Sequence, residues 1–142
     1  MNRPTPETEA IMVRRFDKDS LIALATAVDG IPSVRTVDAF YEEGSFYVLT
    51  YADSGKMKQM EQNPTVAIAG EWFTAHGTGE NLGWFGAAEN ARLAAKMRQV
   101  FAEWIDNGHN NLDDPKTIIL RIRLSDAVLM ADGNRYCITY AD

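Results

Sequence analysis

The chain has 142 residues, which suits one compact domain and leaves little room for a second. Hydrophobic residues make up 46% of it and charged residues 24%, a composition that is typical of a folded globular protein and excludes a disordered one. The formal net charge is -6, and this excess of acid disfavours binding to nucleic acid or to an anionic membrane surface. We therefore expect a single domain, 1–142, with no nucleic-acid and no membrane partner.

The apolar runs and the cysteine content indicate the cellular compartment of such a protein. The longest mostly apolar run, 21–28, is far shorter than the roughly 20 residues of a membrane-spanning helix, and the amino-terminal residues lack the apolar core of a secretory signal. The single cysteine, Cys137, cannot form an internal disulfide, which fits a reducing compartment. The two histidines, His76 and His109, lie far apart without neighbouring thiols. We expect a cytoplasmic protein without a metal site.

The first half of the chain predicts one helix followed by three antiparallel strands. Thr5 and Pro6 are typical of a helix start, and apolar positions continue to Phe16 before a charged cluster ends the helix. Strands are expected at 21–28, 31–41 and 45–50, joined by the tight-turn pair Asp29-Gly30 and by a turn at 42–44. Consecutive strands with such short connections form a meander.

The second half predicts a short helix, further strands and one long helix. The short helix begins near Asp53 or Ser54 and ends before Pro64, and strands follow at 65–70 and 71–84, the latter bent at its glycines. Apolar residues at helical spacing predict a helix over 88–105, and alternation predicts a strand over 117–124. After a break at 125–126, a hairpin is expected from 128–130 and 135–140. The resulting fold class is mainly β (α+β), a six- to seven-stranded antiparallel barrel with peripheral helices.

Two places in the sequence carry positive charge in a context that suggests a ligand. Arg35 lies within a strand otherwise suited to burial, where a guanidinium needs an anionic partner unless it faces solvent from an edge. Ser54 and Lys56 lie at a predicted helix start, where free backbone N–H groups, a hydroxyl and an ammonium can hold a phosphate. The simpler interpretation of this second feature is a Ser-capped helix with a solvated lysine.

The segment 72–84 combines aromatic residues with polar residues and glycines, a mixture that can line a pocket for a planar ring. His76 and Thr78 belong to this segment. Most aromatic residues are core residues and a lone histidine is more often structural than catalytic, so a structural role is the stronger interpretation. No Ser–His–Asp arrangement is apparent, and His76 is the side chain to test first as an acid or base.

Together these residues resemble the pyridoxamine 5'-phosphate oxidase-like, FMN-binding split-barrel family, and within it a small bacterial subgroup of general-stress-type proteins. The resemblance covers most of the chain, from about residue 21 to the end. It rests on Pro32-Ser33-Val34-Arg35-Thr36-Val37, on 46–50 continued by Ser54-Gly55-Lys56 and Asn63-Pro64, and on 71–77.

This resemblance implies an obligate homodimer with FMN bound in clefts between the subunits. An arginine of the second strand and the start of the following helix would hold the FMN phosphate, while strand backbone would lie along the flavin. The implied cofactor-binding residues are Arg35, Ser54 and Lys56 at the phosphate, Thr36, Val37, Leu49 and Thr50 along the flavin, and Thr78, in a segment that the partner subunit would contribute.

The chain also departs from the oxidase pattern. Phe40 occupies a position where the family often carries a lysine, and Gly55 stands where an arginine usually precedes the helix lysine. The carboxy-terminal Arg/His signature that grips pyridoxal phosphate is absent. Vitamin B6 oxidation is therefore not expected.

Three functions fit these features. The first is an FMN-dependent oxidoreductase of unknown small-molecule substrate, in which the flavin performs the redox chemistry and the protein binds and orients it. The second is a non-catalytic module that holds FMN, another flavin or haem for storage or sensing. The third is a structural dimer with a vacated pocket. The sequence identifies neither the substrate nor the catalytic residues.

Overall fold

The computed structural model describes residues 2–140, so residues 1, 141 and 142 of the expected domain lie outside the described part. Its helices are α1 (Pro6–Phe16), α2 (Gly55–Gln62) and α3 (Ala91–Val100), and a 3-10 turn, η1 (Ala88–Asn90), precedes α3. None of the helices between residues 2 and 140 is long and apolar enough to cross a membrane. The strands are β1 (Ser20–Val28), β2 (Ile31–Glu42), β3 (Ser45–Tyr51), β4 (Thr65–Gly70), β5 (Phe73–Trp84), β6 (Thr117–Ala131) and β7 (Asn134–Thr139).

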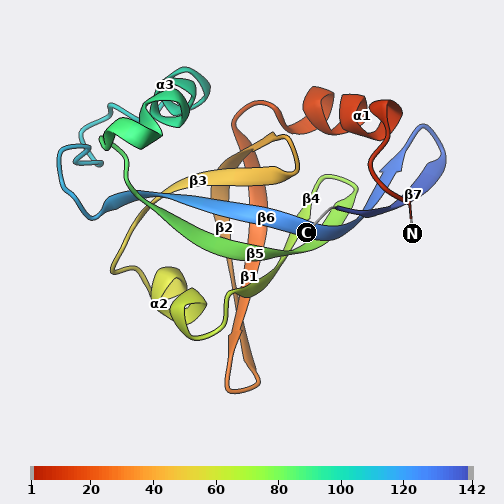
Figure 1. The fold of residues 1–142 in the computed structure, drawn as a ribbon, viewed down its shortest axis with the longest axis horizontal. Coiled ribbons are helices and arrows are strands. Elements are labelled where there is room, and N and C mark those ends of the chain that lie inside the picture. The colour runs from red at the N-terminus through yellow and green to blue at the C-terminus, as the bar shows by residue number, and fades with distance from the viewer. Residues whose placement is uncertain (1, 141–142) are drawn as a thin grey trace.

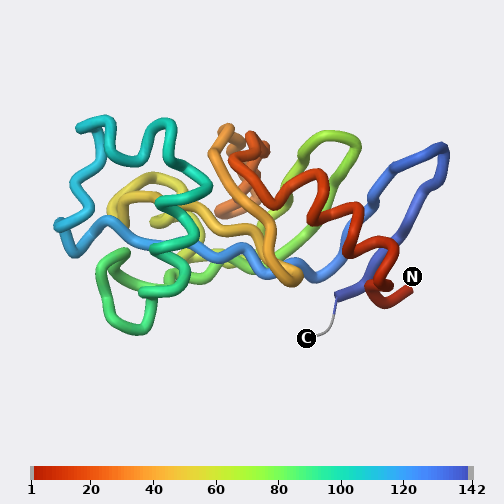
Figure 2. The backbone as a smooth tube through the Cα atoms, turned by 90° about the horizontal axis from the view of Figure 1, so that it is seen from above, coloured from red at the N-terminus to blue at the C-terminus, as the bar shows by residue number. Residues whose placement is uncertain are grey.

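The strands form one antiparallel sheet that closes into a barrel (Figure 1). Their order is β3-β2-β1-β4-β5-β6-β7, and β3 also pairs with β6, so that six strands of the described chain complete a ring. β7 pairs with β6 and extends the sheet beyond the ring. Figure 2 shows α1 and the β6–β7 hairpin toward one end of the molecule and α3 with the segment after it at the other. This architecture confirms the mainly β, antiparallel barrel with peripheral helices.

A tight turn sets the register of the first hairpin. Asp29 (φ 53°) and Gly30 (φ 78°) both adopt left-handed backbone conformations, as in two-residue turns that match the twist of a hairpin. They pair Val28 with Ile31, which aligns Leu24 with Arg35 further along the strands. The turn therefore determines which residues of β1 lie beside Arg35.

Two apolar clusters stabilise the fold, one inside the barrel and one outside it. In the view of Figure 1, α1 contributes Met12 and Phe16 to the interior cluster from above, and α2 contributes Met57 and Met60 from below. The outer cluster lies where α3 and the segment after it pack against the barrel. Its buried members are Phe40, Tyr47, Phe85, Met97, Phe101, Ile105 and Ile119.

β2 and β3 separate soon after the turn that joins them. Their ladder covers only Phe40, Tyr41 and Glu42 of β2, after which β2 continues along β1 and β3 continues along β6. Within the described residues, the second edge of β2 at 31–39 and the facing edge of β3 at 48–51 thus have no strand partner. We call the opening between these two edges the split. Figure 1 shows the β1–β2 hairpin extending away from the body of the barrel, on the same side as α2.

The helix expected over 88–105 is shorter in the structure. The α-helix ends at Val100, and 101–107 forms successive turns. The backbone N–H groups of Trp104 and Ile105 both donate to the carbonyl of Phe101, at 3.0 and 2.8 Å. Such turns bring the chain back every three or four residues, so Phe101 and Ile105 keep a helical spacing of apolar residues without forming a regular helix.

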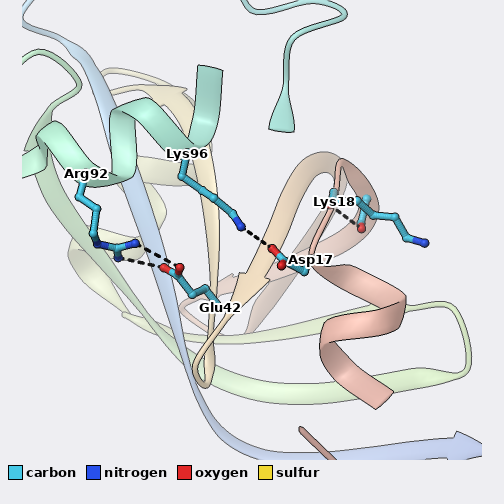
Figure 3. Close-up of polar contacts among 6 residues, drawn as sticks. Asp17, Lys18, Glu42, Arg92 and Lys96 are labelled. Atoms are coloured by element: carbon cyan, nitrogen blue, oxygen red, sulfur yellow. Dashed lines mark hydrogen bonds and ion pairs between the residues drawn. The ribbon is translucent and has the colours of Figure 1, made fainter. Parts of the chain in front are cut away.

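Polar contacts fix α3 to the amino-terminal half of the chain (Figure 3). Arg92 Nη2 lies 2.9 Å from Glu42 Oε2 at the end of β2, and Lys96 Nζ lies 2.8 Å from Asp17 Oδ1 after α1. Beyond the helix, Trp104 Nε1 donates to Asp19 Oδ2 at 2.9 Å. These contacts hold α3 and the segment 101–116 in a defined place beside β2 and β3.

β6 is one continuous strand, although the sequence predicted a break at 125–126. His76 pairs with Asp126 while the next residue, Gly77, pairs with Leu124, so Ser125 is an extra residue that bends β6 without ending it. A side chain at Gly77 would not fit here, because its Cβ would lie 2.7 Å from the carbonyl oxygen of Arg123. A β-bulge therefore explains the polar residues that suggested a turn.

Candidate functional site

Arg35 lies on β2 beside the split, and its guanidinium is held by neighbouring groups. Its Nη1 donates to the carbonyl of Leu24 at 3.2 Å and to Thr26 Oγ1 at 2.9 Å, and its Nη2 donates to Gln59 Oε1 at 2.7 Å. The residue is half-buried, and this burial lowers the pKa of Arg35 from its ordinary value. The hydrogen bonds therefore fix a partly desolvated cation in one orientation.

Lys56 brings a second cation to the same place. Ser54 caps α2, with its Oγ accepting from the backbone N–H of Met57 at 3.4 Å, so that Lys56 lies in the first turn of the helix. Burial lowers the pKa of Lys56, and the positive charge of Arg35 lowers it further. Lys56 and Gln59 are three residues apart on α2, and Gln59 accepts from Arg35, so Lys56 lies on the face of the helix that is directed toward the guanidinium.

Neither cation has a carboxylate partner in the described part of the chain. Among the ion pairs formed by residues 2–140, none includes Arg35 or Lys56. Two partly buried positive charges that repel each other are unfavourable unless an anion compensates them. The arrangement is chemically suited to bind a multiply charged anion such as a phosphate.

The structure adds two residues to this site that sequence reasoning missed, Thr26 and Gln59. Thr26 could have been found, because the Asp29-Gly30 turn sets the register and makes Thr26 the diagonal neighbour of Arg35 across the β1–β2 pair. Gln59 follows Lys56 by three residues, and residues at that spacing lie on one face of a helix. Its amide oxygen accepts from both Arg35 and Thr26 and so joins α2 to the barrel.

The predicted strand residues lie along the two edges of the split. On β2, the side chain of Thr36 is exposed, whereas Val37 packs against the interior cluster. On β3, Leu49 packs against the outer cluster and Thr50 is buried near the end of the strand. The structure therefore brings Arg35, Thr36 and Val37 to one side of the opening and Leu49 and Thr50 to the other.

Thr78 does not join this group within one chain. It lies on β5, where it pairs with Thr65 of β4 and with Arg123 of β6, and the strand order separates β5 from β2. His76 lies two residues earlier, with an exposed side chain whose Nδ1 is 2.9 Å from Asp126 Oδ1. A contribution of 72–78 to the split would have to come from a second copy of the chain.

The two departures from the oxidase pattern have different structural reasons. Phe40 is completely buried in the outer cluster, where its ring lies 5.4 Å from that of Tyr47, so a lysine there would enter the core. Gly55 is exposed at the first position of α2, and a Cβ at this residue would meet no atom within 4 Å. Of these two positions, only that of Gly55 has room for an additional cation.

Comparison with known proteins agrees with this fold. A family model described as pyridoxamine 5'-phosphate oxidase matches residues 9–130. No curated protein sequence matches the chain. Among solved structures, an FAD-binding protein from Mesorhizobium loti superposes with a TM-score of 0.66 at 17% identity, covering 87% of this chain and 91% of the other.

Two further structures extend the comparison. General Stress Protein 26 from Bacillus anthracis str. Sterne has a TM-score of 0.64 and 16% identity, and the match covers 90% of this chain and 97% of that one. A heme binding protein from Mycobacterium smegmatis has a TM-score of 0.67 and 16% identity, with 98% of this chain and 60% of that one covered. At such identities these likenesses concern the fold. Since the family model spans most of the sequence, the chain belongs to the pyridoxamine 5'-phosphate oxidase family.

Proposed function

We propose that this protein is an FMN-binding flavoprotein that works as a homodimer and as an FMN-dependent oxidoreductase on a small molecule. The observation that carries the proposal is the convergence of Arg35 and Lys56, both without a carboxylate partner in the described chain, beside an open split in the barrel. FMN combines the two chemical parts that such a place requires, a phosphate and a planar ring.

The phosphate of FMN matches the charged end of the site. A phosphate monoester carries a charge of about -1.5 to -2 near neutral pH, which two cations balance. Arg35 is already oriented by Thr26 and Gln59, so little side-chain entropy is lost when it binds an anion. Free backbone N–H groups in the first turn of α2 and the Ser54 hydroxyl supply further donors at the same point.

The split suits the rest of the cofactor. An unpaired strand edge presents backbone N–H and C=O groups that need partners, and the polar rim of a flavin has both donors and acceptors. Thr36 and Val37 on one edge and Leu49 and Thr50 on the other are the proposed walls. When bound, the flavin supplies hydride or electron transfer, and these residues bind it and limit its access to water.

The outer face of the sheet supports the homodimer. Ala25 pairs with Val34 on one side and with Ala67 on the other, and Ala23 pairs with Ala69, so these side chains share one face. Val34 is 70% exposed. A flat face of small apolar residues is suited to close contact with an identical face, as a twofold dimer requires. Such contact would also allow Thr78 of the partner subunit to approach the cofactor.

The proposal locates this dimer in the cytoplasm, where the one cysteine, Cys137, stays reduced. Its electron donor would be a soluble reductant such as NADH or NADPH. Oxidation of a reduced pyridine nucleotide by the FMN-loaded protein, followed at 340 nm, separates an oxidoreductase from a protein that only stores or senses its ligand.

The decisive experiment compares FMN with riboflavin, which has the same ring and no phosphate. Each flavin is titrated into the purified protein, and binding is followed by quenching of flavin fluorescence. We expect FMN to bind about a hundredfold more tightly than riboflavin, because the phosphate meets two cations. Equal affinities for the two flavins would contradict the phosphate assignment, and no binding of either would contradict the flavoprotein assignment. Light scattering after size-exclusion chromatography gives the oligomeric state.

A further inference from the structure

A separate cavity of about 340 Å³ lies at the end of β3, where the strand approaches the loop after α3. From β3 it is lined by Leu49, Thr50 and Tyr51, and from the loop by His109, Asn110 and Asp114, among others. Leu49 and Thr50 also form one edge of the split. The cavity therefore adjoins the region proposed for the flavin, and it differs from the phosphate-binding end formed by Arg35 and Lys56.

We propose that this cavity is the substrate pocket, that it takes a small uncharged molecule with hydrogen-bond acceptors, and that His109 is its main donor. The inference rests on the proposed function, because it treats the end of β3 as the wall shared by substrate and flavin. It assigns a role in binding to the loop that connects α3 and β6.

Charge in the lining selects an uncharged ligand. Among residues 2–140, the cavity lining includes no lysine or arginine, and its one acidic residue is Asp114. Lys116, which is close in sequence, is paired with Asp53 Oδ2 at 2.6 Å. A phosphate or carboxylate in this cavity would meet a carboxylate and no cation, so it would lose its hydration without compensation. The lining instead offers neutral hydroxyl, amide and imidazole groups.

The side chain of His109 is free to bind a ligand, whereas the loop around it is fixed. The His109 imidazole forms no hydrogen bond to any residue in 2–140; the only bond of this residue is from its backbone N–H to Asn107 Oδ1, at 2.9 Å. The loop is held by Thr117 Oγ1, which donates to the carbonyl of Asn111 at 2.7 Å, and by Trp84 Nε1, which donates to the carbonyl of Leu112 at 3.0 Å. A fixed loop with one unused donor is what a binding pocket requires.

The size of the cavity sets an upper limit on the ligand. Small-molecule pockets have volumes of about 300–1,000 Å³, so this one lies at the small end of the range. It accommodates a single ring with a polar substituent, such as an aromatic amide, carbonyl or quinone, and excludes a whole nucleotide. This expectation differs from a phosphorylated vitamin, which would need cations in the pocket.

The test uses benzamide and benzoate, two probes of equal size that differ in charge. Each is titrated into the apoprotein and into the FMN-loaded protein while the imidazole signals of the two histidines are followed by NMR. We expect benzamide to shift the His109 signal, to leave that of His76 unchanged, and to bind about tenfold more tightly than benzoate. His109→Ala should weaken benzamide binding by about tenfold, and His109→Gln by less, because glutamine keeps an N–H donor.

Asp113→Ala is the matched control and should leave benzamide affinity unchanged, since Asp113 is an exposed residue of the same loop and does not line the cavity. Benzoate binding as tightly as benzamide would overturn the assignment of an uncharged ligand. Unchanged benzamide affinity in His109→Ala would overturn the role of His109. The residues that line the cavity all belong to the protein, so benzamide can be tested without FMN. Benzamide binding in a protein that binds no FMN would reject the proposed function and support the pocket. FMN binding in a protein whose His109 signal does not respond to benzamide would reject only the pocket.

Discussion

The two ends of β2 belong to one strand and have opposite roles. At its paired end, 40–42, the strand pairs with β3 and so closes the barrel, and Phe40 and Tyr41 are almost fully buried, one in each apolar cluster. At its open end, 31–39, the strand pairs with β1 and leaves its other edge to the split, and it carries Arg35, whose hydrogen bonds leave donors unused. The paired end stabilises the fold and the open end is suited to bind a ligand.

This difference shows how a small barrel can carry a site without weakening its core. Pairing stops where β2 and β3 separate, and the core loses nothing there, because Val37 and α2 still cover the interior. Polar groups released from pairing become available to a ligand at the same point. If this comparison is correct, substitutions at the two ends of β2 should affect different measurements.

The largest effect is expected at the paired end. Phe40→Ala removes a completely buried ring that stacks on Tyr47 and contacts Phe101 edge-on, so it should lower the free energy of unfolding by about 3–5 kcal/mol. Urea denaturation measures the change. The folded variant should keep FMN affinity within about threefold of the parent. A stable Phe40→Ala protein that had lost FMN binding would show that the two ends are not separate in function.

The next effect is expected at the open end. Arg35→Ala should weaken FMN binding by about tenfold or more, roughly 1.4 kcal/mol, because it removes the oriented guanidinium. Fluorescence titration gives both dissociation constants, with riboflavin as the phosphate-free reference. Arg14→Ala, an exposed change on α1, is the matched control for loss of one positive charge. The same affinity in Arg35→Ala and in the parent would refute the assignment.

The pH dependence of binding should report the second cation. Burial and the charge of Arg35 lower the pKa of Lys56 below its ordinary value of 10.5, so Lys56 loses its proton earlier than a solvated lysine as the pH rises. FMN affinity should therefore fall in the alkaline range below pH 10.5. It should also fall below pH of about 6, where the phosphate gains a proton. Lys56→Met should weaken FMN binding near neutral pH and abolish the decrease in affinity at alkaline pH, while the decrease at acidic pH remains. If Lys56→Met kept the alkaline decrease, Lys56 would be excluded from the site.

A gain of affinity is expected from Gly55→Arg. The residue is exposed in the first turn of α2, and a Cβ there meets no atom within 4 Å. A third cation beside the phosphate should tighten FMN binding by about threefold to tenfold. Gly55→Gln adds a side chain of similar length without charge and should have a smaller effect. Weaker FMN binding in Gly55→Arg would indicate that the phosphate lies elsewhere.

The smallest effect concerns Asp38, at the boundary between the two ends. Burial, together with a hydrogen bond and the negative charge of Asp19, raises the pKa of Asp38 from 3.8 to about 6. The folded state thus binds the proton more tightly than the unfolded state, and this group lowers the free energy of unfolding as the pH rises from 3.8 through 6. Asp38→Asn should raise the melting temperature at pH of about 8 and change it little at pH of about 4. An equal change at both values would mean that Asp38 does not titrate in this window.

Sequence reasoning predicted what depends on neighbours along the chain. The strand meander, the Ser54 cap and the turn at Asp29-Gly30 follow from local propensity, and each was confirmed. The break expected in β6 was wrong because a bulge can accommodate Ser125 within a strand. The end of α3 was wrong because turns at 101–107 give the same apolar spacing as a helix.

The site was predictable in part for a similar reason. Arg35 is a charged residue within a predicted strand, and Lys56 is a cation at a predicted helix start. Each residue could therefore be identified separately as a candidate from the sequence. Their convergence depends on how α2 packs against β1 and β2, and Gln59 links these elements by accepting from Thr26 and from Arg35. His109 lies in a polar loop, and only the closed barrel brings it to the end of β3.

The split also has a consequence for the life of the protein in a cell. If FMN occupies the split as proposed, the newly made chain without FMN has two unpaired strand margins, and such margins recruit strands from other molecules. On β2, Pro32 has no backbone N–H and so hinders pairing with a strand from another molecule. On β3, residues 48–51 include no proline and lack this protection. On that proposal, the yield of soluble protein in a riboflavin-starved culture should decline, with the missing material in inclusion bodies, and riboflavin supply would aid folding as well as redox chemistry.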